Sequence, residues 1–239
     1  MLNRKLLPVL FAFLIPCFLP AQVTPDEARV NKVFNSLTLE EKANLCQGDP
    51  GVERFGIPSF EMTDGGRGPH GNGEPVTGFP AGIGMASAWN PDLMYKAGVV
   101  WGEEARTLGR TFLLGPACNI LRDPLGGRFF EYFSEDPLLT AELAVPAIQG
   151  IQSRDVIACV KHFACNNREN NRNDYYSIVD ERTLHEIYFP AFKAAVEKAD
   201  VQAIMTSANG VNFEFVSDSR RLLTGLLRDR WGFDGLIIM

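Results

Sequence analysis

Short apolar runs alternate along the chain with longer segments in which apolar positions recur at helical spacing. After Asn90, apolar residues follow one another at i, i+4, i+7 and i+8 and therefore share one helical face; they are Leu93, Ala97, Val100 and Trp101. Thr24 and Thr38 each precede acidic residues, which is typical of a helix start. The sequence predicts further helices over residues 137–152, 180–198 and 219–230, and strands over residues 60–63, 111–114, 155–162, 201–206 and 235–239.

The alternation of strands and helices predicts an α/β fold, a parallel sheet with helices outside it. The predicted strands are short and apolar, as expected when both faces of a sheet are covered. About five strands are predicted, which is too few for a complete eight-stranded barrel. The sequence ends on a strand, without the loop that would carry functional residues, so we expect it to be an incomplete chain.

Residues 1–21 have the layout of a secretory signal peptide. A positive start is followed by an apolar run of about 14 residues, Leu6 to Leu19, and polar sequence begins after Ala21. The alternative is a membrane anchor, but the run is shorter than the roughly 20 residues that cross a bilayer, and prolines interrupt it. We therefore expect cleavage, a secreted or periplasmic location, and a mature domain over residues 22–239.

The composition is that of a globular protein with an acidic balance. The chain has 23 Lys and Arg against 29 Asp and Glu, a net charge of −6, which becomes −8 when the leader is removed. Proteins that bind nucleic acid through its phosphates are usually basic, so we expect a neutral small molecule as ligand, with no nucleic acid or membrane partner. An apolar fraction of 46% excludes disorder as the main state.

Four cysteines remain after the leader: Cys46, Cys118, Cys159 and Cys165. An exported protein can form disulfides, and four cysteines allow three complete pairings, between which the sequence does not decide. The sequence has no C-x-x-C pair, which argues against a zinc site. We expect buried thiols or at most one bridge, and neither a metal nor a cofactor.

Three polar clusters follow predicted strands, at residues 63–71, 119–137 and 161–172. Functional residues of parallel α/β proteins lie at the carboxyl ends of strands, so the clusters could share one site. Their mixture of acids, bases and amides suits a polyhydroxyl ligand. Other interpretations stay open, because Asp64 before glycines could be a turn residue. The charged residues of the second cluster could form a structural ion-pair network; they are Arg122, Arg128, Glu131, Glu135 and Asp136.

The order of these motifs resembles glycoside hydrolase family 3. The longest is Asn-Ile-x-Arg-x-Pro-x-Gly-Gly-Arg-x-Phe-Glu-x-x-Ser-Glu-Asp-Pro at residues 119–137, between Thr-Asp-Gly at 63–65 and Lys-His-Phe at 161–163. The stretch from Asn166 to Arg172 is similar to the β-glucosidase and β-xylosidase branch. The resemblance implies an incomplete (β/α) barrel, truncated after about five strands, as the partial N-terminal domain of such an enzyme.

The resemblance also implies the residues that bind the sugar at the cleavage point. These are Asp64, Arg128, Lys161, His162 and Arg172, with His70 at a position where the family usually has Arg or His. Glu131, Glu135 and Asp136 would be structural. Ala208 stands where the family usually has Tyr, which bears on sugar preference.

Neither reacting carboxylate of the family falls within this sequence. The nucleophile would follow the strand at 235–239, just past Met239, and the acid/base would come from a C-terminal domain packed against this one. The resemblance implies a secreted retaining glycosidase that hydrolyses terminal β-D-glucosyl or xylosyl residues of β-linked oligosaccharides, of which this fragment alone is inactive. The alternative is a non-catalytic carbohydrate-binding module. A nicotinamide-dependent oxidoreductase is disfavoured, because no strand–Gly-x-Gly-x-x-Gly–helix unit occurs.

Overall fold

The computed structural model describes residues 25–47 and 51–239, and the chain divides into two compact units, residues 1–57 and 58–239. The predicted leader and its boundary at residue 21 lie outside the described residues. The division after Ile57 falls within the range predicted as one mature domain, 22–239. No helix in the described ranges combines the length and the apolar content that a membrane span requires.

The first unit contains two helices, α1 (Pro25–Ser36) and α2 (Leu39–Cys46), and a short 3₁₀ turn, η1 (Glu53–Phe55). Thr38 begins α2 as the sequence predicts. Its hydroxyl accepts from the Glu41 backbone N–H at 3.2 Å, and the Glu41 carboxylate accepts from the Thr38 N–H at 2.8 Å. Arg54 donates to the same carboxylate at 2.5 Å and, with the Thr38 N–H, lowers the pKa of Glu41 to about 2.

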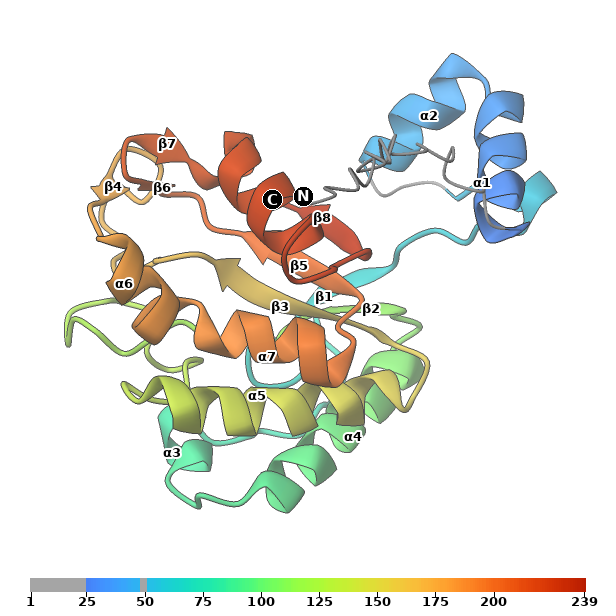
Figure 1. Ribbon diagram of the computed structural model, residues 1–239. Helices are drawn as coiled ribbons and strands as arrows, with labels where there is room; N and C mark the ends of the chain where they lie inside the picture. Colours follow the sequence, from blue (N-terminus) through green and yellow to red (C-terminus); the bar gives the residue numbers. More distant parts are fainter. Residues whose placement is uncertain (1–24, 48–50) are drawn as a thin grey trace, which may run out of the picture. The chain divides into compact units, whose positions relative to one another are not determined.

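The second unit is built on a parallel sheet in the order β1-β2-β3-β5-β8 (Figure 1). Its strands are β1 (Met62–Asp64), β2 (Phe112–Leu114), β3 (Ile157–Phe163), β5 (Ala203–Thr206) and β8 (Leu236–Ile238). Each lies within or next to a predicted strand. The α/β class and the parallel five-stranded sheet are therefore confirmed, and the sheet is open, as expected of a partial barrel.

Helices cover one face of this sheet. The helices α4 (Pro91–Thr107), α5 (Pro137–Gln152) and α7 (Pro190–Ala199) pack in that order, and Figure 1 shows them as one layer beside the strands. Glycines permit the close approach of α4 and α5: a Cβ at Gly98 would lie 2.2 Å from the Ala147 carbonyl oxygen. The helix over 137–152 has the predicted bounds, and Asp136 caps it by accepting from the Leu138 N–H at 2.7 Å.

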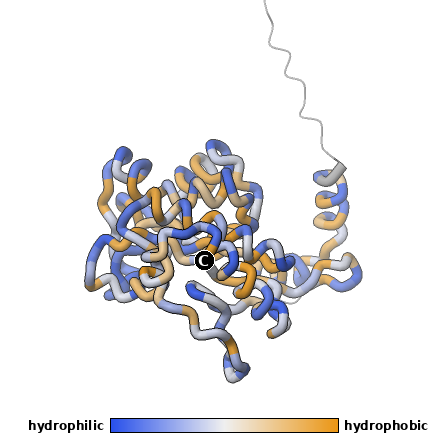
Figure 2. The backbone as a smooth tube through the Cα atoms, turned by 90° about the horizontal axis from the view of Figure 1, so that it is seen from below, coloured by the Kyte–Doolittle hydropathy of each residue, from blue (hydrophilic) through white to orange (hydrophobic). Residues whose placement is uncertain are grey.

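The core between sheet and helices is aromatic at its centre. Phe163 of β3 packs against Phe189, Phe192 and Trp231, with ring centroids 5.3 to 6.1 Å apart. Neighbouring strand residues alternate between the two faces, so Leu113 joins this core while Phe112 joins a smaller apolar cluster on the other face. Figure 2 shows the resulting alternation of apolar and polar stretches along the backbone.

Two predicted helices are irregular. The helix predicted over 180–198 is α6 (Glu181–Thr183), a π-helical turn η2 (Leu184–Tyr188) and then α7. Pro190 lacks the N–H that a continuous helix needs, which accounts for the break before it. The helix predicted over 219–230 is the π-helical η4 (Arg221–Arg228), preceded by the 3₁₀ turn η3 (Val216–Asp218).

Three short strands and one helix were not predicted. The strands β4 (Tyr176–Ser177), β6 (Gly210–Val211) and β7 (Glu214–Phe215) form a small second sheet. The helix is α3 (Gly82–Ala86), at the end of the glycine-rich stretch. The four described cysteines are all free thiols, and Cys118, Cys159 and Cys165 are buried, as the sequence indicates.

Candidate functional site

The three polar clusters converge at the carboxyl end of the parallel sheet. Asp64 is the last residue of β1, and Lys161 and His162 lie near the end of β3. Arg128 lies in the long loop after β2, and Arg172 in the loop after β3. Parallel strands with one direction bring all of these segments to one edge.

The convergence forms a cavity of about 400 Å³, which we call the polar cavity. It is lined by Asp64, Leu114, Gly127, Arg128, Phe130, Lys161, His162, Glu169, Arg172 and Met205. Five of the six predicted site residues are therefore brought together. The sixth, His70, is exposed and is not in the lining, although its backbone N–H donates to the Asp64 carbonyl at 3.0 Å.

Ion pairs order the floor of the polar cavity. The Lys161 ammonium donates to the Asp64 carboxylate and lies 3.8 Å from Glu131, while the Arg128 guanidinium donates to Glu131. The side chains of Lys161 and Glu131 are only 2% and 3% exposed. Half-burial by itself would raise the pKa of Asp64, but the hydrogen bond and charge of Lys161 lower it overall. Burial by itself would lower the pKa of the Arg128 guanidinium. The hydrogen bond to Glu131 and the charge of that carboxylate outweigh burial and raise the pKa overall.

His162 is fixed through its backbone by a buried amide. The Asn119 Nδ2 donates to the His162 carbonyl at 2.8 Å, and the Asn119 Oδ1 accepts from the His162 N–H at 2.7 Å. The same Oδ1 lies 3.3 Å from the ring Nδ1. Burial, together with the charges of Arg128, Lys161 and Arg172, holds the pKa of His162 well below its usual range, so the ring is neutral.

A second set of hydrogen bonds connects residues at the polar cavity. The Asn166 Nδ2 donates to the Tyr132 hydroxyl at 3.1 Å and to Glu169 at 3.0 Å. Glu169 in turn accepts from Arg172 at 2.9 Å. The supporting roles of Tyr132, Asn166 and Glu169 were not predicted. The only available signal was their position inside the motifs at 119–137 and 166–172.

Each carboxylate at the polar cavity is bound to a cation. Asp64 pairs with Lys161, Glu131 with Arg128, and Glu169 with Arg172. The arrangement offers several N–H donors and a few ordered acceptors, which suits a ligand with many hydroxyl groups. In the part of the chain that the structure describes, no group of three or more His, Cys, Asp or Glu residues could hold a metal ion.

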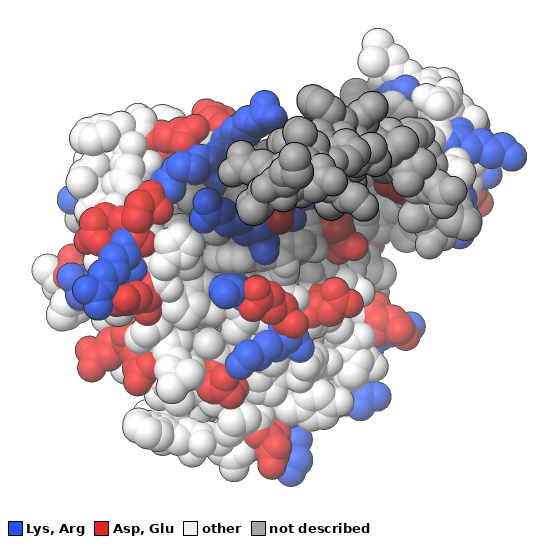
Figure 3. All heavy atoms as spheres, in the orientation of Figure 1, with Lys and Arg blue, Asp and Glu red and all other residues white. Residues whose placement is uncertain are grey.

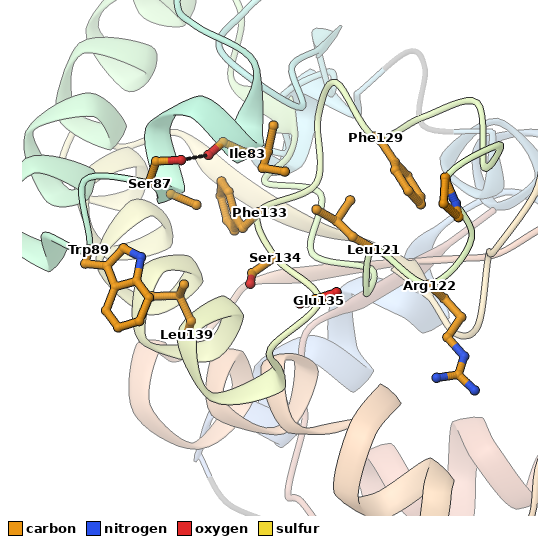
Figure 4. Close-up of a pocket in the computed structure, with 12 residues that line it drawn as sticks. Ile83, Ser87, Trp89, Leu121, Arg122, Phe129, Phe133, Ser134, Glu135 and Leu139 are labelled. Atoms are coloured by element: carbon orange, nitrogen blue, oxygen red, sulfur yellow. Dashed lines mark hydrogen bonds between the residues drawn. The ribbon is translucent and has the colours of Figure 1, made fainter.

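A larger cavity, of about 550 Å³, is also lined by residues of the loop after β2 (Figure 4). We call it the aromatic cavity. Its lining includes Ile83, Trp89, Leu121, Phe129, Phe133 and Leu139, with Arg122, Ser134 and Glu135 among its polar residues. The idea of one ion-pair network in this motif is therefore only partly right. Arg128 pairs with Glu131, whereas Arg122 and Glu135 make no ion pair with any described residue.

The visible face of the molecule carries mixed charge. Figure 3 shows acidic and basic side chains interspersed over the second unit, without one large area of a single sign.

Comparison with known proteins gives consistent matches over most of the chain. The family model described as "Glycosyl hydrolase family 3 N terminal domain" matches residues 29–239. Thermostable beta-glucosidase B of Acetivibrio thermocellus is 46% identical over 228 residues, which is 87% of this chain and 30% of that protein. An exo-alpha-(1->6)-L-arabinopyranosidase of Bifidobacterium longum is 43% identical over 222 residues, covering 84% of this chain and 29% of that protein.

Among solved structures, beta-glucosidase 3B from Thermotoga neapolitana in complex with glucose superposes with a TM-score of 0.81. It is 40% identical in sequence, and the match covers 87% of this chain and 33% of that one. The chain thus spans about 30% of the length of the curated relatives it matches.

Proposed function

The chain belongs to glycosyl hydrolase family 3, and on that premise we propose that its polar cavity holds the terminal β-D-glucosyl or xylosyl residue of an oligosaccharide. The enzyme of which it forms part would be a retaining β-glycosidase. Residues 1–21 would direct its export to the periplasm or out of the cell.

One observation carries the proposal. Five side chains from three separate segments of the sequence line one cavity of about 400 Å³; they are Asp64, Arg128, Lys161, His162 and Arg172. That volume is in the range of pockets that hold small ligands. Because the charged groups are already paired and partly dehydrated, they are held in place before a ligand enters, which favours strong hydrogen bonds to hydroxyl groups.

The same cavity argues for binding and orientation rather than for bond cleavage. A retaining glycosidase needs two carboxyl groups about 5–5.5 Å apart, one to attack and one to protonate the leaving oxygen. The carboxylates of Asp64, Glu131 and Glu169 are each held by a cation, which makes them poor nucleophiles and poor acids. We propose that both reacting groups come from outside these residues, and that the 239-residue chain does not hydrolyse glycosides by itself.

Titration of the chain with methyl β-D-glucopyranoside and methyl β-D-xylopyranoside, followed by NMR, tests the binding role. We expect weak binding that Arg172→Gln reduces by about 10-fold or more, since hydrogen bonds from charged groups contribute about 1.5–3 kcal/mol. Arg182→Gln is the matched control, because it also breaks an exposed ion pair close in sequence, with Glu186, and lies outside the cavity lining. Equal affinities for the two variants would contradict the proposal.

A rate assay tests the second part. With an aryl β-glucoside, the chain should hydrolyse no faster than the double variant Lys161→Ala, His162→Ala. A rate clearly above that of the double variant would overturn the assignment of the reacting groups to other parts of the enzyme.

A further inference from the structure

The amide of Asn119 has only one possible orientation. A backbone carbonyl only accepts hydrogen bonds and a backbone N–H only donates them. Because Asn119 meets both of these groups of His162, at 2.8 Å and 2.7 Å, its Nδ2 must face the carbonyl and its Oδ1 must face the N–H. The usual ambiguity between oxygen and nitrogen in an asparagine side chain is thus removed by the protein itself.

This orientation places an obligatory acceptor beside the imidazole. The Asn119 Oδ1 lies 3.3 Å from the His162 Nδ1, within hydrogen-bonding reach. A neutral imidazole carries one proton, on either Nδ1 or Nε2. With the proton on Nδ1, the ring donates to Oδ1. With the proton on Nε2, lone pairs of Nδ1 and Oδ1 would face each other inside a buried, poorly screened site.

We propose that Asn119 is a positioning residue that keeps the proton of His162 on Nδ1, so that Nε2 is a hydrogen-bond acceptor for a ligand hydroxyl in the polar cavity. The assignment of the tautomer stands on the contacts of Asn119 alone. The assignment of the hydroxyl as its ligand rests on the proposed function.

The charges around the ring explain what this tautomer supplies. Arg128, Lys161 and Arg172 line the same cavity as His162 and can only donate, while the carboxylates of Asp64, Glu131 and Glu169 are already engaged by these cations. A bare Nε2 is therefore an acceptor that no cation occupies among the described contacts. A hydroxyl group placed between Nε2 and one of the cations would donate to the first and accept from the second.

One competing arrangement involves Tyr132. Its hydroxyl lies 3.5 Å from the His162 Nδ1 and could donate to that nitrogen if Nδ1 were bare. The contact to Asn119 is shorter by 0.2 Å and has an acceptor of fixed orientation. The Tyr132 oxygen accepts from Asn166, whose amide is oriented by the carboxylate of Glu169, and the Tyr132 proton stays free to donate. The two arrangements differ in what they predict for removal of the Tyr132 hydroxyl: the tautomer is unchanged if Asn119 sets it and changes if Tyr132 sets it.

Long-range ¹H–¹⁵N correlation spectra of the ¹⁵N-labelled 239-residue chain at pH 7.5 measure the tautomer directly. The sequence has three histidines, so spectra of His70→Gln and His185→Gln identify the His162 signals by elimination. We expect a protonated Nδ1 and a bare Nε2 in the unmodified chain. Tyr132→Phe should leave both signals unchanged, and Asn119→Ala should shift population to the Nε2–H form.

The results that would overturn the proposal are equally specific. A protonated Nε2 in the unmodified chain contradicts it, as does a Tyr132→Phe variant that changes tautomer. If Asn119→Ala does not fold, the spectra of the unmodified chain and of Tyr132→Phe still decide between the two arrangements.

Addition of saturating methyl β-D-glucopyranoside tests the ligand half. The bare Nε2 resonance should move upfield as it accepts a hydrogen bond, while Nδ1 stays protonated. An unchanged Nε2 signal would overturn the hydroxyl assignment. If the glucoside shifts backbone amide signals of other cavity residues in the ordinary ¹H–¹⁵N spectrum of the same sample, the proposed function stands. If it shifts none of them, the proposed function fails as well. The tautomer assignment is unaffected in either case.

Discussion

The two cavities of the second unit share one loop and differ in their lining, their volume and the pairing of their charged side chains. Arg128 and Phe130 line the polar cavity, whereas Phe129 and Phe133 line the aromatic cavity, so successive parts of one segment serve both. The aromatic cavity is the larger, at about 550 Å³ against about 400 Å³. The family resemblance points to the smaller one.

The difference lies in how charge is held. Glu131 contacts two cations that line the polar cavity, Arg128 and Lys161, and is only 3% exposed, so its desolvation is offset only by good partners. In the aromatic cavity Arg122 and Glu135 are exposed and make no ion pair with any described residue. The binding role proposed for the polar cavity therefore rests on buried, paired charges and not on cavity size.

The largest effect should come from removing a buried carboxylate. Glu131→Gln leaves Arg128 without its partner and Lys161 with less compensation, so we expect the free energy of unfolding to fall by about 3–5 kcal/mol. Glu135→Gln, the same change four positions later, should stay within about 0.5 kcal/mol. Urea denaturation of both variants measures the difference. Equal losses of the free energy of unfolding would contradict the difference in charge pairing between the two cavities.

A glycine of α3 packs closely against the loop that both cavities share. Gly82 begins α3, and a Cβ there would lie 2.5 Å from the Tyr132 carbonyl oxygen, which belongs to the backbone and cannot move alone. We expect Gly82→Ala to lower the free energy of unfolding by about 1–3 kcal/mol. Gly84→Ala, in the same helix, meets only Pro80 at 3.6 Å and should be neutral or stabilising by less than about 1 kcal/mol. A destabilisation of equal size at both positions would contradict the close packing at Gly82.

The pH dependence of stability should report the neutral ring of His162. Burial and nearby cations lower its pKa, so the folded state resists the proton that the unfolded chain takes up below about pH 6.5. The contribution of the neutral ring to the free energy of unfolding is complete above that pH. It is lost as the pH falls, by about 1.4 kcal/mol per pH unit for one proton. Urea denaturation between pH 5 and 8 should show this slope in the unmodified chain and a smaller one in His162→Gln. Identical slopes below pH 6.5 would exclude a buried neutral ring.

The smallest effect is expected in the aromatic cavity. Trp89 is 74% exposed, so Trp89→Ala should change the free energy of unfolding by less than about 0.5 kcal/mol. Trp101 is fully buried and provides the contrast, since Trp101→Ala should cost about 3–5 kcal/mol. The emission of each tryptophan is obtained as the difference between the unmodified chain and the variant that lacks it, Trp89→Ala or a folded Trp101→Phe. Acrylamide should quench the emission of Trp89 much more than that of Trp101. Equal quenching would mean that Trp89 is covered in solution.

Much of the fold could be predicted because local patterns and tertiary structure agree. The five strands of the main sheet are mostly apolar, with their polar residues toward the carboxyl ends, and Asn90 and Asp136 cap their helices as their residue types suggest. The irregular segments were missed for a physical reason. The π-helical turn Leu184–Tyr188 buries Leu184 and Tyr188, which stand at the i, i+4 spacing of an α-helix, so periodicity alone does not distinguish the two.

The site was predicted in part. Motif order located the five polar residues of the cavity, because strands of one direction end at one edge. The sequence did not reveal that Asn119 orients His162 or that Asn166 joins Tyr132 to Glu169, because these contacts connect residues up to 43 positions apart through buried amides. His70 was predicted from its place in a motif, and its side chain lies outside the cavity lining.

The strand order bears on how local opening of the molecule can be followed. β8 pairs with β5 at the edge of the sheet opposite to β1, and none of its residues lines the polar cavity. Fraying of this strand would expose the Leu236 amide to hydrogen–deuterium exchange while the ion pairs around Lys161 persist. In low denaturant, exchange at β8 should therefore speed up before the imidazole signals of His162 change, and the two measurements would report separate opening events.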